Sequence, residues 1–177
     1  MKPPELIETP RLRLRLPEIG DAGAIFEQYA QDAEVTRYLT WKPHRSREET
    51  VGFLKGVLSA WRERSAYAWV ITRKPDHCLL GMIALRLEGH KANLGYVLTR
   101  AYWGQGYMTE AAQPVVELAL QQSEIFRLWA VCDVDNLASA RVLEKLGMSR
   151  EGRLRRWIMH PNISAEPRDC WCYALIK

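Results

Sequence analysis

The sequence predicts a single α+β domain over residues 1–177, with one mostly antiparallel sheet of about seven strands and about four flanking helices. Three observations predict this class. A length of 177 residues suits one hydrophobic core, and the composition, 47% apolar and 26% charged, is typical of globular domains. Strand-like segments come in runs, and longer segments with helical spacing separate those runs.

The first third of the chain predicts one strand and two helices. Residues 11–16 alternate Arg and Leu, as in a strand with one buried face. Asp21 is expected to cap a helix over residues 22–29, and Ser46 to cap a second helix within a capping box. Between these helices lies an aromatic-rich loop without clean periodicity, which holds Tyr38, Trp41 and His44.

Three strands with hairpin-like spacing follow, and after them helices alternate with strands. Residues 94–133 read as strand, helix and strand, which predicts a parallel pair with a right-handed crossover. Pro114 should kink that helix or shorten its first part. Asn136, with Asp135 beside it, can cap the next helix. The expected strands after the first are 67–72, 79–87, 92–98, 127–133, 153–159 and 171–176.

A glycine turn joins the strand ending at Leu98 to the helix that carries Met108. Gly104 and Gly106 let a ligand approach the backbone, and the first N–H groups of a helix lack intrahelical partners. The turn therefore predicts an anion site that could hold a pyrophosphate. The alternative is a plain tight turn, because the motif matches neither of the familiar nucleotide-binding glycine loops.

Composition and charge make several other classes of protein less suitable. No apolar run is long enough for a transmembrane helix, and the N-terminus lacks an apolar leader, so a cytoplasmic protein is expected. The net charge of +4 without a basic block does not indicate nucleic-acid binding. The four cysteines are expected to be free thiols, and no convincing set of metal ligands is present.

Motifs along nearly the whole chain resemble the GCN5-related N-acetyltransferase (GNAT) superfamily, and more narrowly its ribosomal-protein-alanine acetyltransferase branch. The motifs, in chain order, are TPRLRLR from Thr9, LGYVL from Leu94, YWGQGYMTEA from Tyr102, RLWAVC from Arg127, NLAS from Asn136, EKLGM from Glu144, EGRLR from Glu151 and YALI from Tyr173. The resemblance implies the GNAT fold, in which two neighbouring parallel strands splay apart and bind acetyl-CoA.

The resemblance also implies which residues bind acetyl-CoA, and that no metal is needed. One strand would pair with the pantetheine arm through Tyr96, Val97 and Leu98. The turn would hold the pyrophosphate through Trp103, Gly104, Gln105, Gly106, Tyr107, Met108 and Thr109. Asn136 and Ser139 would lie beside the cofactor arm. Trp103 and Met108 depart from the superfamily's pattern, so the backbone must do most of the holding.

The implied reaction is direct transfer of acetyl to a neutral amine. Many members use a tyrosine as general acid at the position that is Leu143 here, so Ser139 is the candidate to stabilise the leaving thiolate. Its alternative role is a helix-start serine that bonds to the backbone. The base could be His44, Glu88, His90 or water. Tyr38, Trp41 and His44 would wall the acceptor pocket, or form an ordinary packed loop.

The sequence therefore favours an acetyl-CoA-dependent N-acetyltransferase whose acceptor is a protein N-terminus or a small-molecule amine. Two alternatives stay open: a non-catalytic CoA- or acyl-CoA-binding module, and a nucleotide-binding regulatory domain. No nucleic-acid or membrane partner is expected. The oligomeric state is also open, with a homodimer as one option.

Overall fold

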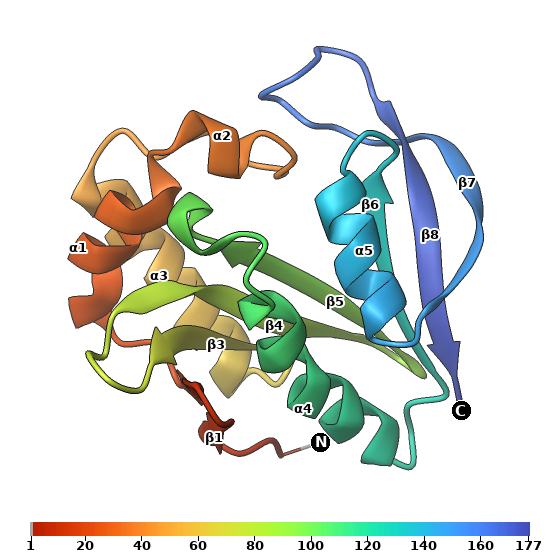
Figure 1. The fold of residues 1–177 in the computed structure, drawn as a ribbon, viewed down its shortest axis with the longest axis horizontal. Helices are drawn as coiled ribbons and strands as arrows, with labels where there is room; N and C mark the ends of the chain where they lie inside the picture. Colours follow the sequence, from red (N-terminus) through yellow and green to blue (C-terminus); the bar gives the residue numbers. More distant parts are fainter. Residues whose placement is uncertain (1) are drawn as a thin grey trace.

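The computed structural model describes residues 2–177 and contains one eight-stranded mixed sheet (Figure 1). The strands lie in the order β1-β2-β3-β4-β5-β6-β8-β7, and only β5 and β6 are parallel neighbours. Their bounds are β1 (Leu6–Glu8), β2 (Leu12–Arg15), β3 (Ala66–Arg73), β4 (Leu79–Glu88), β5 (Lys91–Leu98), β6 (Arg127–Asp133), β7 (Ser149–Ile158) and β8 (Arg168–Ile176). The predicted class is confirmed, with β1 as one more strand than the periodicity indicated.

Helices cover both faces of the sheet. They are α1 (Ala22–Ile25), α2 (Ala33–Thr36), α3 (Arg47–Arg62), α4 (Tyr107–Gln121) and α5 (Leu137–Lys145), and a π-helical turn at Phe26–Ala30 extends α1. In Figure 1, α4 and α5 lie in front of the sheet and α3 lies behind it. No helix within residues 2–177 combines the length and the apolar character needed to cross a bilayer.

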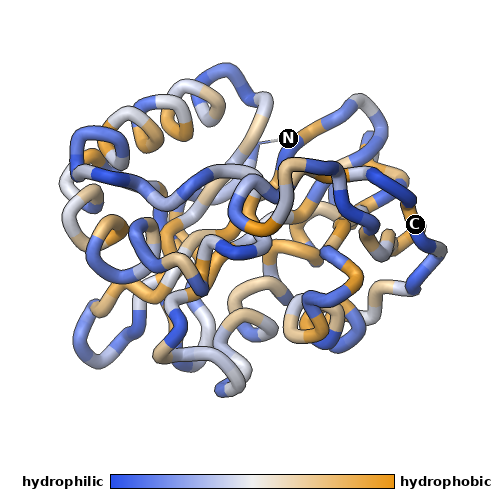
Figure 2. Tube along the Cα trace, turned by 90° about the horizontal axis from the view of Figure 1, so that it is seen from above, coloured by the Kyte–Doolittle hydropathy of each residue, from blue (hydrophilic) through white to orange (hydrophobic). Residues whose placement is uncertain are grey.

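Two apolar clusters hold these layers together. Successive strand side chains point to opposite faces, and β3 accordingly sends Trp69 into one cluster and Val70 into the other. The Trp69 cluster includes α4 and α5, while the Val70 cluster includes Leu54 of α3 and the buried Tyr29. Figure 2 shows hydrophobic segments toward the middle of the molecule and hydrophilic segments in the peripheral loops.

Two of the three predicted helix caps are confirmed. Ser46 Oγ accepts from the Glu49 N–H at 3.4 Å, and Asn136 Oδ1 accepts from the Ser139 N–H at 3.1 Å. The cap by Asp21 is wrong, because Arg15 and the Glu18 N–H bind its carboxylate instead.

Pro114 was predicted to kink its helix or to shorten its first part, and the shortening is wrong, since α4 runs unbroken through this residue. The buried face of α4, which packs against the sheet, outweighs the lost backbone donor. All four cysteines are free, as expected.

Candidate active site

The parallel strands β5 and β6 separate in the middle of the sheet. Their pairing covers only Lys91–Asn93 against Arg127–Trp129. Beyond it, β5 follows β4 as far as Leu98 and β6 follows β8 as far as Asp133 (Figure 1). A wedge with two facing strand edges results, and an edge of this kind can accept an extended ligand as an added strand.

A glycine of β4 lets the end of β5 approach β4 closely. Gly81 pairs with Leu98, and a Cβ at position 81 would lie only 2.1 Å from the Val97 carbonyl oxygen. Only glycine allows the two backbones to approach this closely. The end of β5 therefore lies tightly against β4, in the part of the strand that does not pair with β6.

A side-chain contact bridges the open part of the wedge, from Tyr96 of β5 to Ser139 in the first turn of α5. The Tyr96 hydroxyl lies 2.8 Å from Ser139 Oγ and 3.3 Å from the Ser139 carbonyl oxygen. From the sequence, Tyr96 was predicted to lie on the strand that binds the cofactor, and Ser139 to stabilise the leaving thiolate. The contact between them was not predicted.

The hydroxyl and thiol groups around this contact are protonated at neutral pH. Burial raises the pKa of Tyr96 well above its ordinary value. Burial also raises the pKa of the Cys132 thiol to about 11, while a hydrogen bond with Ser139 opposes that rise. Protonated groups can donate hydrogen bonds, so this end of the wedge suits a developing negative charge.

The glycine turn forms the start of α4, as predicted. Gly104 and Gly106 have φ of 74° and 78°, values that favour glycine, and no side chain of the described residues caps the helix. The first helical bond from this turn runs from the Glu110 N–H to the Gly106 carbonyl at 3.0 Å. Preceding N–H groups of the first turn are therefore available to an anion.

Trp103 fixes the path between β5 and this turn. Its indole Nε1 donates to the Leu98 carbonyl oxygen at 2.7 Å, although 45% of the side chain is exposed. The Leu98 carbonyl therefore already has a protein partner. Trp103, one of the two residues that depart from the superfamily's pattern, thus binds the end of β5.

The aromatic loop after α2 packs against the face of the sheet that α3 covers, opposite α4 and α5. Trp41 belongs to the same apolar cluster as Val97 of β5. The His44 ring lies 5.0 Å from the Trp41 ring, and its Nδ1 bonds to Thr50 Oγ1 at 2.8 Å. Burial lowers the pKa of His44, so the imidazole is neutral at pH 7.

A second loop, between β7 and β8, is tied to this aromatic loop. The Asn162 amide donates to the carbonyl oxygens of Thr36 and Trp41 at 2.7 and 2.8 Å. The ring of His160 meets Tyr38 edge-on at 6.2 Å. Figure 1 shows this loop reaching from β8 toward α2. The sequence did not indicate this tie, because its partners lie more than 100 residues apart.

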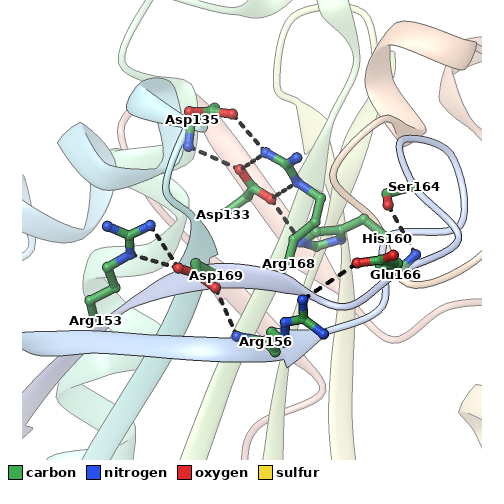
Figure 3. Close-up of polar contacts among 9 residues, drawn as sticks. All are labelled: Asp133, Asp135, Arg153, Arg156, His160, Ser164, Glu166, Arg168 and Asp169. Atoms are coloured by element: carbon green, nitrogen blue, oxygen red, sulfur yellow. Dashed lines mark hydrogen bonds and ion pairs between the residues drawn. The ribbon is translucent and has the colours of Figure 1, made fainter.

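Asp133, the last residue of β6, lies against Arg168 at the start of β8 and His160 of the β7–β8 loop (Figure 3). Its carboxylate accepts two bonds from Arg168, at 2.6 and 3.0 Å, and one from the Asp135 N–H at 2.9 Å. Burial opposes ionisation, but these bonds hold the pKa of Asp133 below its ordinary value. The buried His160 lies 3.7 Å from the same carboxylate. From the sequence, Asp133 was predicted only as the last residue of a strand, and its contacts with Arg168 and His160 were not foreseen.

The structure separates two candidate bases from this assembly. Glu88 pairs with Lys91, and His90 lies in the hairpin turn between them, so both are exposed at the closed end of β5. At the rise of a strand, Leu98 is about 23 Å from Lys91. Glu88 and His90 are therefore not brought together with Tyr96 and Ser139.

An eight-stranded mixed sheet that opens between two parallel strands beside a glycine-capped helix is the architecture of the GNAT acetyltransferases. The family model for the acetyltransferase (GNAT) domain matches residues 11–149, and the chain belongs to this family. Family membership makes the protein a transferase.

Individual relatives agree with this assignment. The N-acetyltransferase YoaA of Bacillus subtilis, itself uncharacterised, is 33% identical over 175 residues that cover 97% of each chain. A crystal structure of a GNAT-family acetyltransferase from Bacillus anthracis superposes with a TM-score of 0.84 at 28% identity, covering 97% of this chain and 98% of the other. RimL, a ribosomal L7/L12 α-N-protein acetyltransferase solved with coenzyme A, superposes with a TM-score of 0.87 at 23% identity, over 97% and 98% of the chains.

Proposed function

We propose that residues 1–177 form one acetyl-CoA-dependent N-acetyltransferase domain that moves acetyl directly to a primary amine. The observation that carries this proposal is the wedge between β5 and β6, which is bridged at its α5 side by Tyr96 and Ser139. The structure of RimL with coenzyme A gives independent support that this fold accommodates the donor.

The donor would lie along the wedge with its pyrophosphate at the start of α4. Backbone edge groups near Tyr96, Val97 and Leu98, other than the Leu98 carbonyl that Trp103 already binds, would pair with the amides of the pantetheine arm. Backbone N–H groups from Trp103 to Thr109 would hold the pyrophosphate, helped by the helix dipole. Asn136 keeps α5 in place by capping it and so positions Ser139 beside the thioester. The proposal involves no metal, and no three His, Cys, Asp or Glu side chains gather as ligands within residues 2–177.

Transfer would proceed by attack of the neutral amine on the thioester carbonyl carbon. The new C–N bond forms, the C–S bond breaks, and the sulfur leaves with the electron pair of that bond. When Tyr96 donates to Ser139 Oγ, the serine proton is free to bond to the departing thiolate. The proton lost by the amine passes to a base, for which the neutral His44 is the candidate, or to water.

The acceptor would enter from the face covered by the tied loops. Tyr38, Trp41 and His44 lie on one of these loops, and Asn162 joins it to the other. This enclosure suits either a peptide N-terminus or a small-molecule amine. RimL, an α-N-protein acetyltransferase, is less than 25% identical and supports the fold alone.

A thiol-release assay tests the proposal. The purified chain is mixed with acetyl-CoA and a panel of peptides with free N-termini, the same peptides with blocked N-termini, and small amines. We expect release of free CoA with at least one unblocked amine and a 42-dalton-heavier product by mass spectrometry, the mass of an added acetyl group. Coenzyme A binding without release across the panel would instead support the non-catalytic module. Preferential binding of ATP would support the regulatory domain.

A further inference from the structure

The tip of the N-terminal hairpin is hydrogen-bonded to the first turn of α4. This tip, Thr9–Arg11, joins β1 to β2. The Thr9 hydroxyl and the Arg11 N–H both donate to Glu110 Oε1, at 2.6 and 2.9 Å, and Arg11 Nε donates to Oε2 at 2.5 Å. Burial opposes ionisation of Glu110, but these donors hold its pKa below the ordinary value. The hairpin and the helix are thus joined by an ionised, fully engaged carboxylate.

The far end of Arg11 lies on the glycine turn itself. Its Nη1 donates to the Gln105 carbonyl oxygen at 3.2 Å, and its guanidinium lies 4.2 Å from the centre of the Tyr107 ring. A Cβ added to Gly106 would lie 3.6 Å from Nη2. Glu110 binds Nε of the Arg11 guanidinium, and Nη1 is therefore free to bind the Gln105 carbonyl of the turn.

The bond to Gln105 controls the direction of a backbone donor. The Gln105 carbonyl and the Gly106 N–H belong to one trans peptide unit, so they point in opposite directions. With its carbonyl held toward Arg11, this peptide directs the Gly106 N–H away from the hairpin. Glycines on both sides of Gln105 would otherwise allow the peptide to rotate, because glycine adopts positive and negative φ with similar ease.

We propose that Arg11 is a positioning residue for the donor's pyrophosphate, through its hold on the Gln105 peptide. This inference rests on the proposed function. The turn lacks a polar side chain at Trp103, where the superfamily's pattern has Gln or Arg, so binding depends on correctly aimed backbone N–H groups. Arg11 orients the Gly106 N–H from the opposite side of the peptide, by binding the Gln105 carbonyl. It contacts neither the thioester nor the acceptor.

The test compares a donor that has a pyrophosphate with one that lacks it. Initial rates are measured with acetyl-CoA and with S-acetyl-pantetheine for the wild-type chain, Arg11→Ala, Arg11→Lys and Arg13→Ala. Arg13 is the matched control, since it is similarly exposed on the same hairpin and pairs with Glu8 rather than with the turn. We expect Arg11→Ala to raise the KM for acetyl-CoA about tenfold with kcat nearly unchanged. Its kcat/KM with S-acetyl-pantetheine should match wild type.

Arg11→Lys keeps one donor for the Gln105 carbonyl but lacks the planar guanidinium. Its KM for acetyl-CoA should therefore fall between those of wild type and Arg11→Ala. Arg13→Ala should match wild type with both donors. Equal losses with both donors for Arg11→Ala would overturn the inference by indicating a general loss of fold. An unchanged KM for acetyl-CoA would overturn it as well.

A double variant separates aiming of the peptide from simple neutralisation of Glu110. If Arg11 only cancelled the charge of Glu110, then Arg11→Ala combined with Glu110→Gln would restore the wild-type KM, and the inference would be wrong. We expect the double variant to stay about tenfold weaker. If wild type transfers acetyl from neither donor, the proposed function fails. In that case, titration of coenzyme A and of pantetheine into wild type and Arg11→Ala still decides the role of Arg11. The inference predicts that Arg11→Ala binds coenzyme A more weakly than wild type does and binds pantetheine equally well.

Discussion

The Tyr96 hydroxyl lies 2.8 Å from Ser139 Oγ and so connects β5 to α5 across the wedge between β5 and β6. A phenol that burial keeps protonated can orient the serine hydroxyl toward a sulfur at this point. The resemblance to the superfamily implies a tyrosine acid at the position that is Leu143 here, whereas the phenol that bonds to Ser139 in this structure is Tyr96 of β5.

Ser139→Ala should lower kcat by about ten- to a hundredfold, because the departing thiolate loses a hydrogen-bond donor. The KM for acetyl-CoA should change less than twofold. Tyr96→Phe should cause a smaller loss, since it only orients the serine. Tyr173→Phe is the control, as it removes another buried hydroxyl that bonds to Glu144 at 3.0 Å. Steady-state kinetics decide, and a Ser139→Ala enzyme with normal kcat and weak binding would refute the leaving-group role.

Gly106→Asp should weaken coenzyme A binding by about a hundredfold. The substitution puts a side chain on a backbone with φ of 78° and a negative charge beside the pyrophosphate. Gly89→Asp is the matched control, because Gly89 has φ of 62° at the closed end of β5. Isothermal titration of both variants separates an effect at the α4 turn from the general effect of an aspartate on a left-handed backbone. Equal affinities would remove the pyrophosphate from this turn.

His44→Gln should lower kcat/KM by about ten- to a hundredfold at pH 7 and flatten the acid limb of the pH profile. Burial lowers the pKa of His44 below 6.5, so the wild-type base is available at neutral pH and is lost as the pH falls through that pKa. His90→Gln, at the closed end of β5, serves as control. A profile whose acid limb is the same in wild type and His44→Gln would assign the base to water.

Asn162→Ala should loosen the tie between the two loops, because the Thr36 and Trp41 carbonyls lose their shared donor. We expect the KM for the acceptor amine to rise about fivefold while the KM for acetyl-CoA stays constant. Ser164→Ala, on the same loop, removes only a local bond to the Glu166 N–H and is the control. A rise confined to the KM for acetyl-CoA would place the acceptor elsewhere.

Asp133→Asn should lower the free energy of unfolding at pH 7 by about 2–4 kcal/mol, because the buried carboxylate binds Arg168. The pKa of Asp133 is lowered in the folded chain, so its contribution is present above the unfolded pKa and is lost as pH falls through the folded pKa. The difference between wild type and variant should therefore shrink in acid. Urea unfolding at pH 7 and pH 3 measures it, with Asp169→Asn on the more exposed Arg153 pair as control.

Several features of the fold could be predicted because they depend on neighbours in the sequence. The caps at Ser46 and Asn136 and the left-handed turn at Gly106 follow from short-range chemistry. Asp21 shows the limit of such reasoning, since Arg15 binds the carboxylate that local rules assigned to a helix. The short strand β1 was missed because it pairs through only three residues and has one half-buried side chain.

By itself, the sequence determined the order of strands and helices, the glycine turn and the family to which the chain belongs. These depend on side-chain periodicity and on backbone preferences within a few residues. Only the tertiary structure decided which groups meet. Tyr96 reaches Ser139 across 43 residues, Arg11 reaches Glu110 across 99, and Asn162 reaches Trp41 across 121. Each contact depends on how elements far apart in the sequence are placed by the order of strands in the sheet, which no local pattern encodes.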